Sequence, residues 1–127
     1  MSKGDAPIRL LVVDDEPDVR LLLGFQLRSA GFEVVGEAGN GRQALDSCAE
    51  LRPDAVVFDL LMPGMSGFAA IPALQAALPD VGIVAYTAVV GDFVRAEMER
   101  LGVALVLKTG DAAPIVEALR ACVKPPG

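Results

Sequence analysis

Hydrophobic and polar residues along this chain follow two alternating periods, one typical of strands and one typical of helices. Five short apolar runs, most of them apolar on both faces, predict parallel strands that helices cover on either side. These runs lie at residues 8–14, 34–38, 55–60, 83–87 and 104–108. Between and after them, apolar residues recur at intervals of three and four, which predicts five amphipathic helices. Leu23 and Leu27 belong to the first helical stripe, and Leu119 belongs to the fifth.

Five β-α units in succession with short connections predict an α/β fold, a single five-stranded parallel sheet that is doubly wound by five helices. Gly31 and Gly102 stand where helices should end, each just before a strand. Pro114 suits the first turn of the last helix, which Asp111 can cap. Pro72 lies about one turn into the third helix, where it predicts a kink or a late helix start.

Length and composition favour one domain with a well-packed core. The chain has 127 residues, of which 53% are hydrophobic. We expect the domain to cover residues 8–123, with an N-terminal extension at 1–7 and a tail or linker start at 124–127. The apolar runs are too short to span a bilayer, and the first residues lack the pattern of a signal peptide. Cys48 and Cys122 both fall in helical apolar patterns, so we expect reduced thiols and a cytoplasmic protein.

The charge and the absence of histidine narrow the chemistry that this chain can perform. A net charge of −6 with scattered Lys and Arg argues against a nucleic-acid surface. The sequence contains no histidine, which excludes His-based acid–base catalysis, a Ser-His-Asp triad, most zinc chemistry and a phosphohistidine carrier. Any chemistry must therefore use carboxylates, lysine, hydroxyl groups or a hard metal ion.

Three aspartates follow two of the predicted strands. Asp14 and Asp15 end the first strand, and Asp59 ends the third. Ligands of open α/β sheets bind beyond the carboxyl ends of the strands, so the three carboxylates would converge if these strands are neighbours. Two carboxylates about 4 Å apart repel by roughly 4 kcal/mol at an effective dielectric of 20, which a raised pKa or a bound cation relieves. Oxygen ligands without His or Cys suit Mg²⁺ best.

Thr87 and Lys108 end the fourth and fifth predicted strands and would face the same edge. Beside a metal-bound carboxylate, a hydroxyl and an ammonium group can contact different oxygens of a phosphoryl group. Each residue alone is an ordinary strand end, but with the three aspartates they describe a site in which an Asp takes up a phosphoryl group as an acyl phosphate. Glu16 and Asp18 are explained more simply, because acidic residues in a first turn complement the helix dipole.

These residues stand in motifs that resemble the receiver domains of bacterial two-component response regulators over about residues 8–123. VVDDEP at 12–17, DLLMPGMSG at 59–67, YTA at 86–88 and the lysine at 108 follow the family's order. The D-x-x-M-P-x-x-x-G stretch is the most specific of them. The resemblance implies a flavodoxin-like sheet with the strand order 2-1-3-4-5. It also implies a signalling switch and not an enzyme that turns over external substrates.

Carried over by position, Asp59 resembles the phosphoacceptor of the family. The resemblance implies that Asp15 and Asp59 ligate Mg²⁺ through their side chains and that Asp14 acts through a water molecule. The backbone carbonyl of Leu61 would supply a further ligand. Mg²⁺ is therefore the expected cofactor.

The resemblance further implies a two-state switch and its partners. Lys108 would pair with the phosphoryl oxygens, while Thr87 would swing in to donate a hydrogen bond and draw the following loop with it. The phosphoryl donor would be a sensor histidine kinase or a phosphotransfer protein. The chain carries no output domain, so its effect would pass to a partner or to a C-terminal domain of a longer protein, through the family's surface of fourth helix, fifth strand and fifth helix. A homodimer is also compatible with the family.

Three features depart from the usual family pattern, and one of them is the segment between Gly102 and Lys108, which is one residue shorter than usual. Leu105 stands where many members have an aromatic residue coupled to the threonine, and Thr109 replaces the usual proline, which excludes a cis X-Pro bond there. Leu61 and Val89 are apolar where polar groups can position the attacking water, so we expect slow autodephosphorylation. KTGD at 108–111 resembles receivers that are attached to helix-turn-helix output domains.

These residues also bear on three other functions. A dehalogenase-type phosphatase requires a second aspartate two residues after the nucleophile, and that position is Leu61. A nucleotide triphosphatase requires a G-x-x-x-x-G-K-[ST] loop, which the sequence lacks. A phosphorylation-independent interaction module is the main alternative, motivated by Leu105 and Thr109. The complete acidic triad, with Thr87 and Lys108, argues against it.

Overall fold

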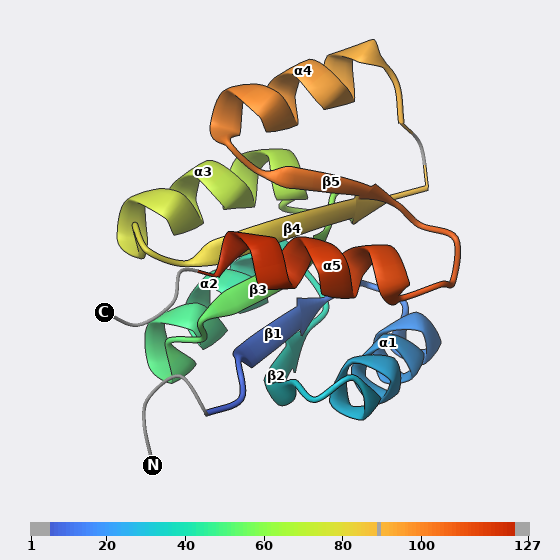
Figure 1. Ribbon diagram of the computed structural model, residues 1–127. Coiled ribbons are helices and arrows are strands. Elements are labelled where there is room, and N and C mark those ends of the chain that lie inside the picture. The colour runs from blue at the N-terminus through green and yellow to red at the C-terminus, as the bar shows by residue number, and fades with distance from the viewer. Residues whose placement is uncertain (1–5, 89, 124–127) are drawn as a thin grey trace.

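A computed structural model describes residues 6–88 and 90–123, in which strands and helices alternate strictly along the chain (Figure 1). The elements are β1 (Arg9–Val13), α1 (Pro17–Ser29), β2 (Glu33–Ala38), α2 (Gly41–Leu51), β3 (Ala55–Asp59), α3 (Gly67–Ala77), β4 (Gly82–Thr87), α4 (Asp92–Leu101), β5 (Ala104–Leu107) and α5 (Ala113–Cys122). Each element matches a predicted strand or helix. No strand end differs from the prediction by more than one residue, and Asp14 and Lys108 directly follow β1 and β5.

The five strands form one parallel sheet in the order β2-β1-β3-β4-β5. Both the parallel sheet and the strand order agree with the prediction. Because β1 pairs with β3, Val13 lies beside Phe58 and the residues that follow β1 meet the end of β3. In the next pair, Asp59 lies beside Tyr86, one residue before the end of β4. This order sets the ends of β1, β3, β4 and β5 at one edge of the sheet.

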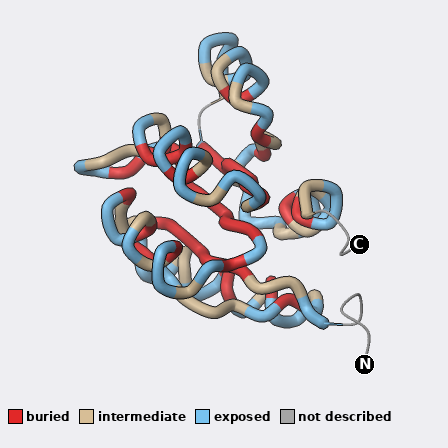
Figure 2. Tube along the Cα trace, turned by 90° about the vertical axis from the view of Figure 1, so that its left-hand side faces the viewer, coloured by how far each residue is buried: buried red, intermediate tan, exposed pale blue. Residues whose placement is uncertain are grey.

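Helices cover both faces of the sheet, and successive strand residues pack alternately against one layer and the other (Figure 1). On one face, Leu27 of α1 and Leu119 of α5 are fully buried against Leu10 of β1. On the other face, α2, α3 and α4 contribute buried residues that include Leu74 and Met98. Burying one such side chain stabilises the fold by about 1.5–3 kcal/mol. Buried residues follow the strands and the inner sides of the helices, and exposed residues follow the outer sides (Figure 2).

Helix ends follow the predicted signals. Gly31 and Gly102 have φ angles of 99° and 71°, in the left-handed region that favours glycine, and both follow helix ends. The N-cap residue of α5 is Ala112, and the preceding Asp111 accepts a hydrogen bond from the amide of Ala113, the first helical residue, at 3.0 Å; Pro114 lies in the first turn, as expected.

Pro72 lies inside α3, which already begins at Gly67. The expectation of a late helix start at Pro72 was therefore wrong. The helix continues because Ile71 and Leu74, on either side of the proline, are buried against the sheet. This packing outweighs the one backbone hydrogen bond that proline cannot make.

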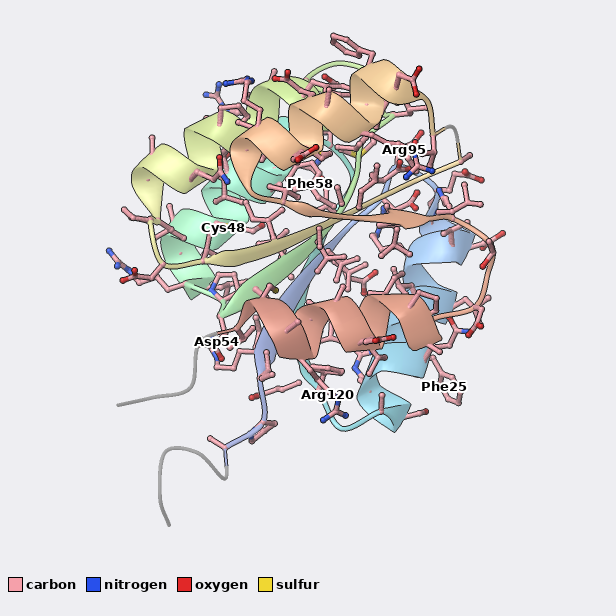
Figure 3. The ribbon with its side chains drawn as sticks, turned by 45° about the horizontal axis from the view of Figure 1, so that its top comes forward. Phe25, Cys48, Asp54, Phe58, Arg95 and Arg120 are labelled. Atoms are coloured by element: carbon pink, nitrogen blue, oxygen red, sulfur yellow. The ribbon has the colours of Figure 1, made fainter. Side chains whose placement is uncertain are left out.

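The remaining predictions for the fold concern the two cysteines, membrane-spanning helices and the domain limits. Cys48 and Cys122 are both free thiols, as expected. Within the described residues, no helix is both long enough and apolar enough to cross a membrane. The proposed domain limits stay predictions, and the tail at 124–127 lies outside the described residues, as does most of the extension at 1–7. Figure 3 shows Phe58 inside the fold and Phe25 pointing away from α1.

Candidate functional site

The predicted site residues gather at the carboxyl edge of the sheet. Asp14 and Asp15 follow β1, Asp59 is the last residue of β3, Thr87 is the last residue of β4, and Lys108 follows β5. Four of the five strands therefore supply the site. Parallel strand order is what brings together residues that are up to 94 positions apart, from Asp14 to Lys108.

The three aspartates form the cluster that the sequence predicts. One carboxylate oxygen from each of Asp14, Asp15 and Asp59 lies within 4.8 Å of the others. Asp14 is fully buried and Asp59 is 3% exposed, whereas Asp15 is partly exposed. Like charges this close repel strongly away from water. The cluster therefore requires positive charge, from the protein or from a bound cation.

Lys108 supplies positive charge to the cluster. Its Nζ lies 2.9 Å from Oδ2 of Asp14 and 3.1 Å from Oδ2 of Asp59. Burial alone would lower the pKa of Lys108, but the hydrogen bonds with Asp14 and Asp59 outweigh burial and raise it. The ammonium group therefore stays protonated at neutral pH, shared between the two buried carboxylates.

Asp59 is a buried carboxylate whose surroundings shift its pKa. Burial raises its pKa, and hydrogen bonds from the Leu61 amide and from Lys108 oppose that rise. The Leu61 N–H donates to Oδ1 of Asp59 at 3.1 Å, so the two oxygens of Asp59 have different donors. Perturbed carboxyl groups of this kind are frequent at functional sites. The Leu61 side chain is half exposed beside the acidic cluster.

Thr87 is buried at the end of β4, and its backbone carbonyl accepts a hydrogen bond from the Lys108 amide at 2.8 Å. This bond ties the end of β5 to the end of β4 next to the acidic cluster. Val89, the second apolar position where water could be oriented, lies outside the described residues. Leu105 packs at the border of the core, and Thr109 Oγ1 accepts a hydrogen bond from the Asp111 amide.

The sequence reasoning missed Tyr86 as a member of the site. Its ring is buried, and its hydroxyl donates a hydrogen bond of 2.6 Å to Oδ2 of Asp14. Lys108 Nζ lies 5.2 Å from the centroid of the same ring. Burial and the neighbouring Asp14 carboxylate both raise the pKa of Tyr86, so it remains a protonated donor. The sequence did offer a signal, because Tyr86 is a single tyrosine in an otherwise apolar strand. A buried phenol hydroxyl needs a hydrogen-bond partner, and the nearby aspartates could supply one.

Glu16 also contributes more than complementing a helix dipole. Its backbone N–H donates to Oδ1 of Asp14 at 2.8 Å, and its carboxylate lies 3.8 Å from Lys108 Nζ. The earlier interpretation of Glu16 was therefore incomplete. After β1 the chain turns, so that the Asp14 side chain accepts a hydrogen bond from the backbone amide of Glu16, two residues later.

The assembled site contains three carboxylates, one ammonium group, a buried phenol and a buried threonine at the carboxyl edge of a doubly wound sheet. Such an edge is where ligands bind in this architecture. Clustered carboxylate oxygens suit a hard divalent cation, and an ammonium group suits an anionic oxygen. Together these groups can accommodate an anion such as a phosphoryl group beside a divalent cation.

Comparison with known proteins points in the same direction. The sequence is 36% identical over 112 residues to the chemotaxis protein CheY of Thermotoga maritima, covering 87% of this chain and 93% of that protein. It is also 36% identical over 119 residues to the transcriptional regulatory protein LiaR of Bacillus subtilis, covering 92% of this chain. The chain spans 56% of the length of LiaR. Similarity therefore extends both to a protein of about this length and to part of a longer one.

The same family is found among solved structures. The crystal structure of a two-component response regulator of the LuxR family from Aurantimonas sp. SI85-9A1 has a TM-score of 0.85 at 30% sequence identity, and the match covers 93% of this chain and 86% of that one. The family model for the response regulator receiver domain matches residues 10–120. This chain therefore belongs to the response regulator receiver domain family.

Proposed function

We propose that this chain is a phospho-accepting receiver domain, in which Asp59 takes a phosphoryl group from a partner histidine kinase or phosphotransfer protein. The observation that carries the proposal is the position of Asp59, which contacts Lys108 at 3.1 Å inside the cluster with Asp14 and Asp15. Family membership supports a signalling role, and the intact cluster favours a working acceptor over a phosphorylation-independent module.

The transfer would be a displacement at phosphorus. A carboxylate oxygen of Asp59 attacks the phosphorus atom, the new O–P bond gives an acyl phosphate, and the N–P bond of the donor phosphohistidine breaks. The electron pair of that bond stays on the departing imidazole nitrogen. Lys108 already lies beside Asp59 and can follow the charge onto the phosphoryl oxygens, so this step needs only a short movement of its Nζ.

The donor set supports Mg²⁺ as the cofactor, because three carboxylate oxygens converge without any His or Cys ligand. In this proposal Asp15 and Asp59 hold the ion through their side chains, the Leu61 carbonyl adds a ligand, and Asp14 acts through water. When bound, Mg²⁺ supplies positive charge that reduces repulsion between these carboxylates and an incoming phosphoryl group.

Phosphorylation of Asp59 would be read out through Thr87. Thr87 ends β4 next to the site, and its carbonyl is already joined to the Lys108 amide. A hydrogen bond from its hydroxyl to the phosphoryl group would draw the loop between β4 and α4 toward Asp59. That movement would change the surface formed by α4, β5 and α5.

Loss of the phosphoryl group is expected to be slow. Leu61 is half exposed beside the cluster and offers no side-chain group that could orient water. We expect Leu61→Asn and Val89→Glu together to speed autodephosphorylation, measured as phosphate release from the purified phosphoprotein. Rates equal to those of the wild type would contradict this assignment.

The identity of the partners is part of the same proposal. The output would pass to another protein or to a C-terminal domain of a longer regulator, and a homodimer is one form in which it could act. The match to LiaR, a transcriptional regulatory protein, supports the second route. The acidic net charge of −6 argues against nucleic-acid binding by this chain itself. We expect the protein to work in the cytoplasm, where sensor kinases present their phosphoryl groups.

Intact-mass measurement tests the proposal. Wild type and Asp59→Asn are incubated with acetyl phosphate, with and without Mg²⁺. We expect the mass of one phosphoryl group to appear in the wild type only, and only with Mg²⁺. No gain by a folded wild type under any condition would favour the phosphorylation-independent interaction module.

A further inference from the structure

We propose that Tyr86 is a positioning residue of the acceptor site, whose hydroxyl holds the Asp14 carboxylate so that Lys108 can leave it for the phosphoryl group. The proposal rests on the function proposed above and adds a residue to it. Tyr86 does not contact the reacting carboxylate in this account. It acts through Asp14 and Lys108.

The hydrogen bonds of Asp14 show why such a residue is needed. Asp14 is fully buried, so bulk solvent does not reach its carboxylate, and apart from a metal-bound water the carboxylate depends on protein donors. Oδ1 accepts the Glu16 amide at 2.8 Å. Oδ2 accepts both the Tyr86 hydroxyl at 2.6 Å and Lys108 Nζ at 2.9 Å. Of these three donors, the amide and the phenol are held by the fold, and the lysine is the one on a flexible side chain.

Lys108 contacts two carboxylates in this structure, and in the proposed reaction it would also contact a phosphoryl group. Its Nζ lies almost equally far from Asp14 and Asp59, at 2.9 Å and 3.1 Å. When the ammonium group moves toward a phosphoryl oxygen on Asp59, it leaves Oδ2 of Asp14. The Tyr86 hydroxyl remains there, so the buried carboxylate is still solvated by a donor. Without that hydroxyl, Oδ2 would depend on Lys108 alone.

The ring of Tyr86 also limits where Lys108 can go. Lys108 Nζ lies 5.2 Å from the ring centroid, which keeps the ammonium group near the site whichever carboxylate it contacts. Tyr86 packs in the core between the sheet and the helices α1 and α5, so the ring cannot turn away. The phenylalanine variant keeps this ring and its packing. It removes the hydroxyl alone.

The main test is the rate of phosphorylation of Tyr86→Phe by acetyl phosphate at saturating Mg²⁺, followed by intact mass. We expect the rate to fall about tenfold or more, because a hydrogen bond to a charged group is typically worth at least that factor. Val84→Ala is the matched control. Val84 lies two residues earlier on the same face of β4 and is fully buried, so its truncation disturbs the same core without touching the hydroxyl. We expect its rate to stay within twofold of the wild type.

Two results of this test would overturn the proposal. One is a Tyr86→Phe rate within twofold of the wild type. The other is an equal loss in Tyr86→Phe and Val84→Ala, which would reduce Tyr86 to a packing residue. Mg²⁺ affinity, measured from the shift of the thermal unfolding midpoint, adds a second reading. We expect it to change in Tyr86→Phe and not in Val84→Ala, because only the former alters the donors of Asp14.

The hydrogen bond itself can be tested without phosphorylation. The chain contains one tyrosine and no tryptophan, so its ultraviolet-excited emission reports on Tyr86. A phenol that donates to a carboxylate has quenched emission, so we expect Asp14→Asn to brighten it. Unchanged emission in that variant would overturn the proposal. A wild type that accepts no phosphoryl group would instead refute the proposed function, and with it the transfer role of Tyr86, while the emission still decides whether the bond exists.

Discussion

Replacing Lys108 with methionine is the most informative perturbation of this site. The substitution keeps an unbranched side chain of similar length and removes the ammonium group. It leaves the carboxylates of Asp14 and Asp59, 0% and 3% exposed, without the cation that lies 2.9 Å and 3.1 Å away from them. We expect a large loss of folding stability in the absence of divalent ions.

The magnitude follows from those distances. At about 3 Å and an effective dielectric of 20, each pair attracts by about 5 kcal/mol. Burying the ammonium group costs several kcal/mol, which offsets much of that attraction. Breaking a buried ion pair by removing one partner typically costs about 3–5 kcal/mol. Because the Lys108 side chain is still 19% exposed and Asp59 can take up a proton, we expect about 3 kcal/mol, near the lower end.

The assay is urea unfolding followed by far-ultraviolet circular dichroism at pH 7. Arg42→Met is the matched control, because it removes a cation that lies 3.9 Å from Asp46 on an exposed helix surface and should cost under about 0.5 kcal/mol. Mg²⁺ should restore more stability to Lys108→Met than to the wild type, since the ammonium group no longer repels the ion. A loss no larger than that of Arg42→Met would refute the electrostatic account of the site.

Three further predictions follow from burial. Burial raises the pKa of Asp59 in the folded state, so keeping Asp59 ionised at neutral pH costs folding stability. In urea unfolding at pH 7, Asp59→Asn should therefore be more stable than the wild type, and this difference should vanish as the pH falls below about 4. A stability difference that does not depend on pH would contradict this prediction. Burial raises the pKa of Cys48 to about 11, so alkylation at pH 8 should modify the partly exposed Cys122 first and Cys48 only after unfolding, as peptide mass mapping would show. Leu119→Ala should cost about 2–5 kcal/mol in the same urea assay, because Leu119 is fully buried; a cost under 1 kcal/mol would contradict its place in the core.

Much of the fold was predictable because apolar residues recur at different intervals in the strands and in the helices, and because glycines mark two helix ends. Gly31 and Gly102 both occupy the left-handed conformation expected of them. The neighbouring positions of β1 and β3, on which the cluster of Asp14 and Asp59 depends, came from the family resemblance. Apolar periodicity alone does not order parallel strands, because every strand that is buried on both faces has the same pattern.

The contacts inside the site were harder to predict than its members. Sequence spacing showed that Lys108 and the aspartates reach one edge, but it could not show that Asp14 is fully buried and bound by three donors. Tyr86 was missed because its ring belongs to the core face of β4, and its contacts with Asp14 and Lys108 depend on how the strands pack. The late helix start at Pro72 was wrong because the packing of α3 outweighs local propensity, while the alternative of a kink there stays a prediction.

The central claim is that Asp59 carries the phosphoryl group, and one measurement tests it most directly. The protein is incubated with acetyl phosphate and Mg²⁺ and then reduced with borohydride, which converts an aspartyl phosphate to homoserine, and its peptides are sequenced by mass spectrometry. The account predicts homoserine at position 59, with Asp14 and Asp15 unchanged. Homoserine at either of those two positions, or an unmodified Asp59 in a phosphorylated chain, would contradict it.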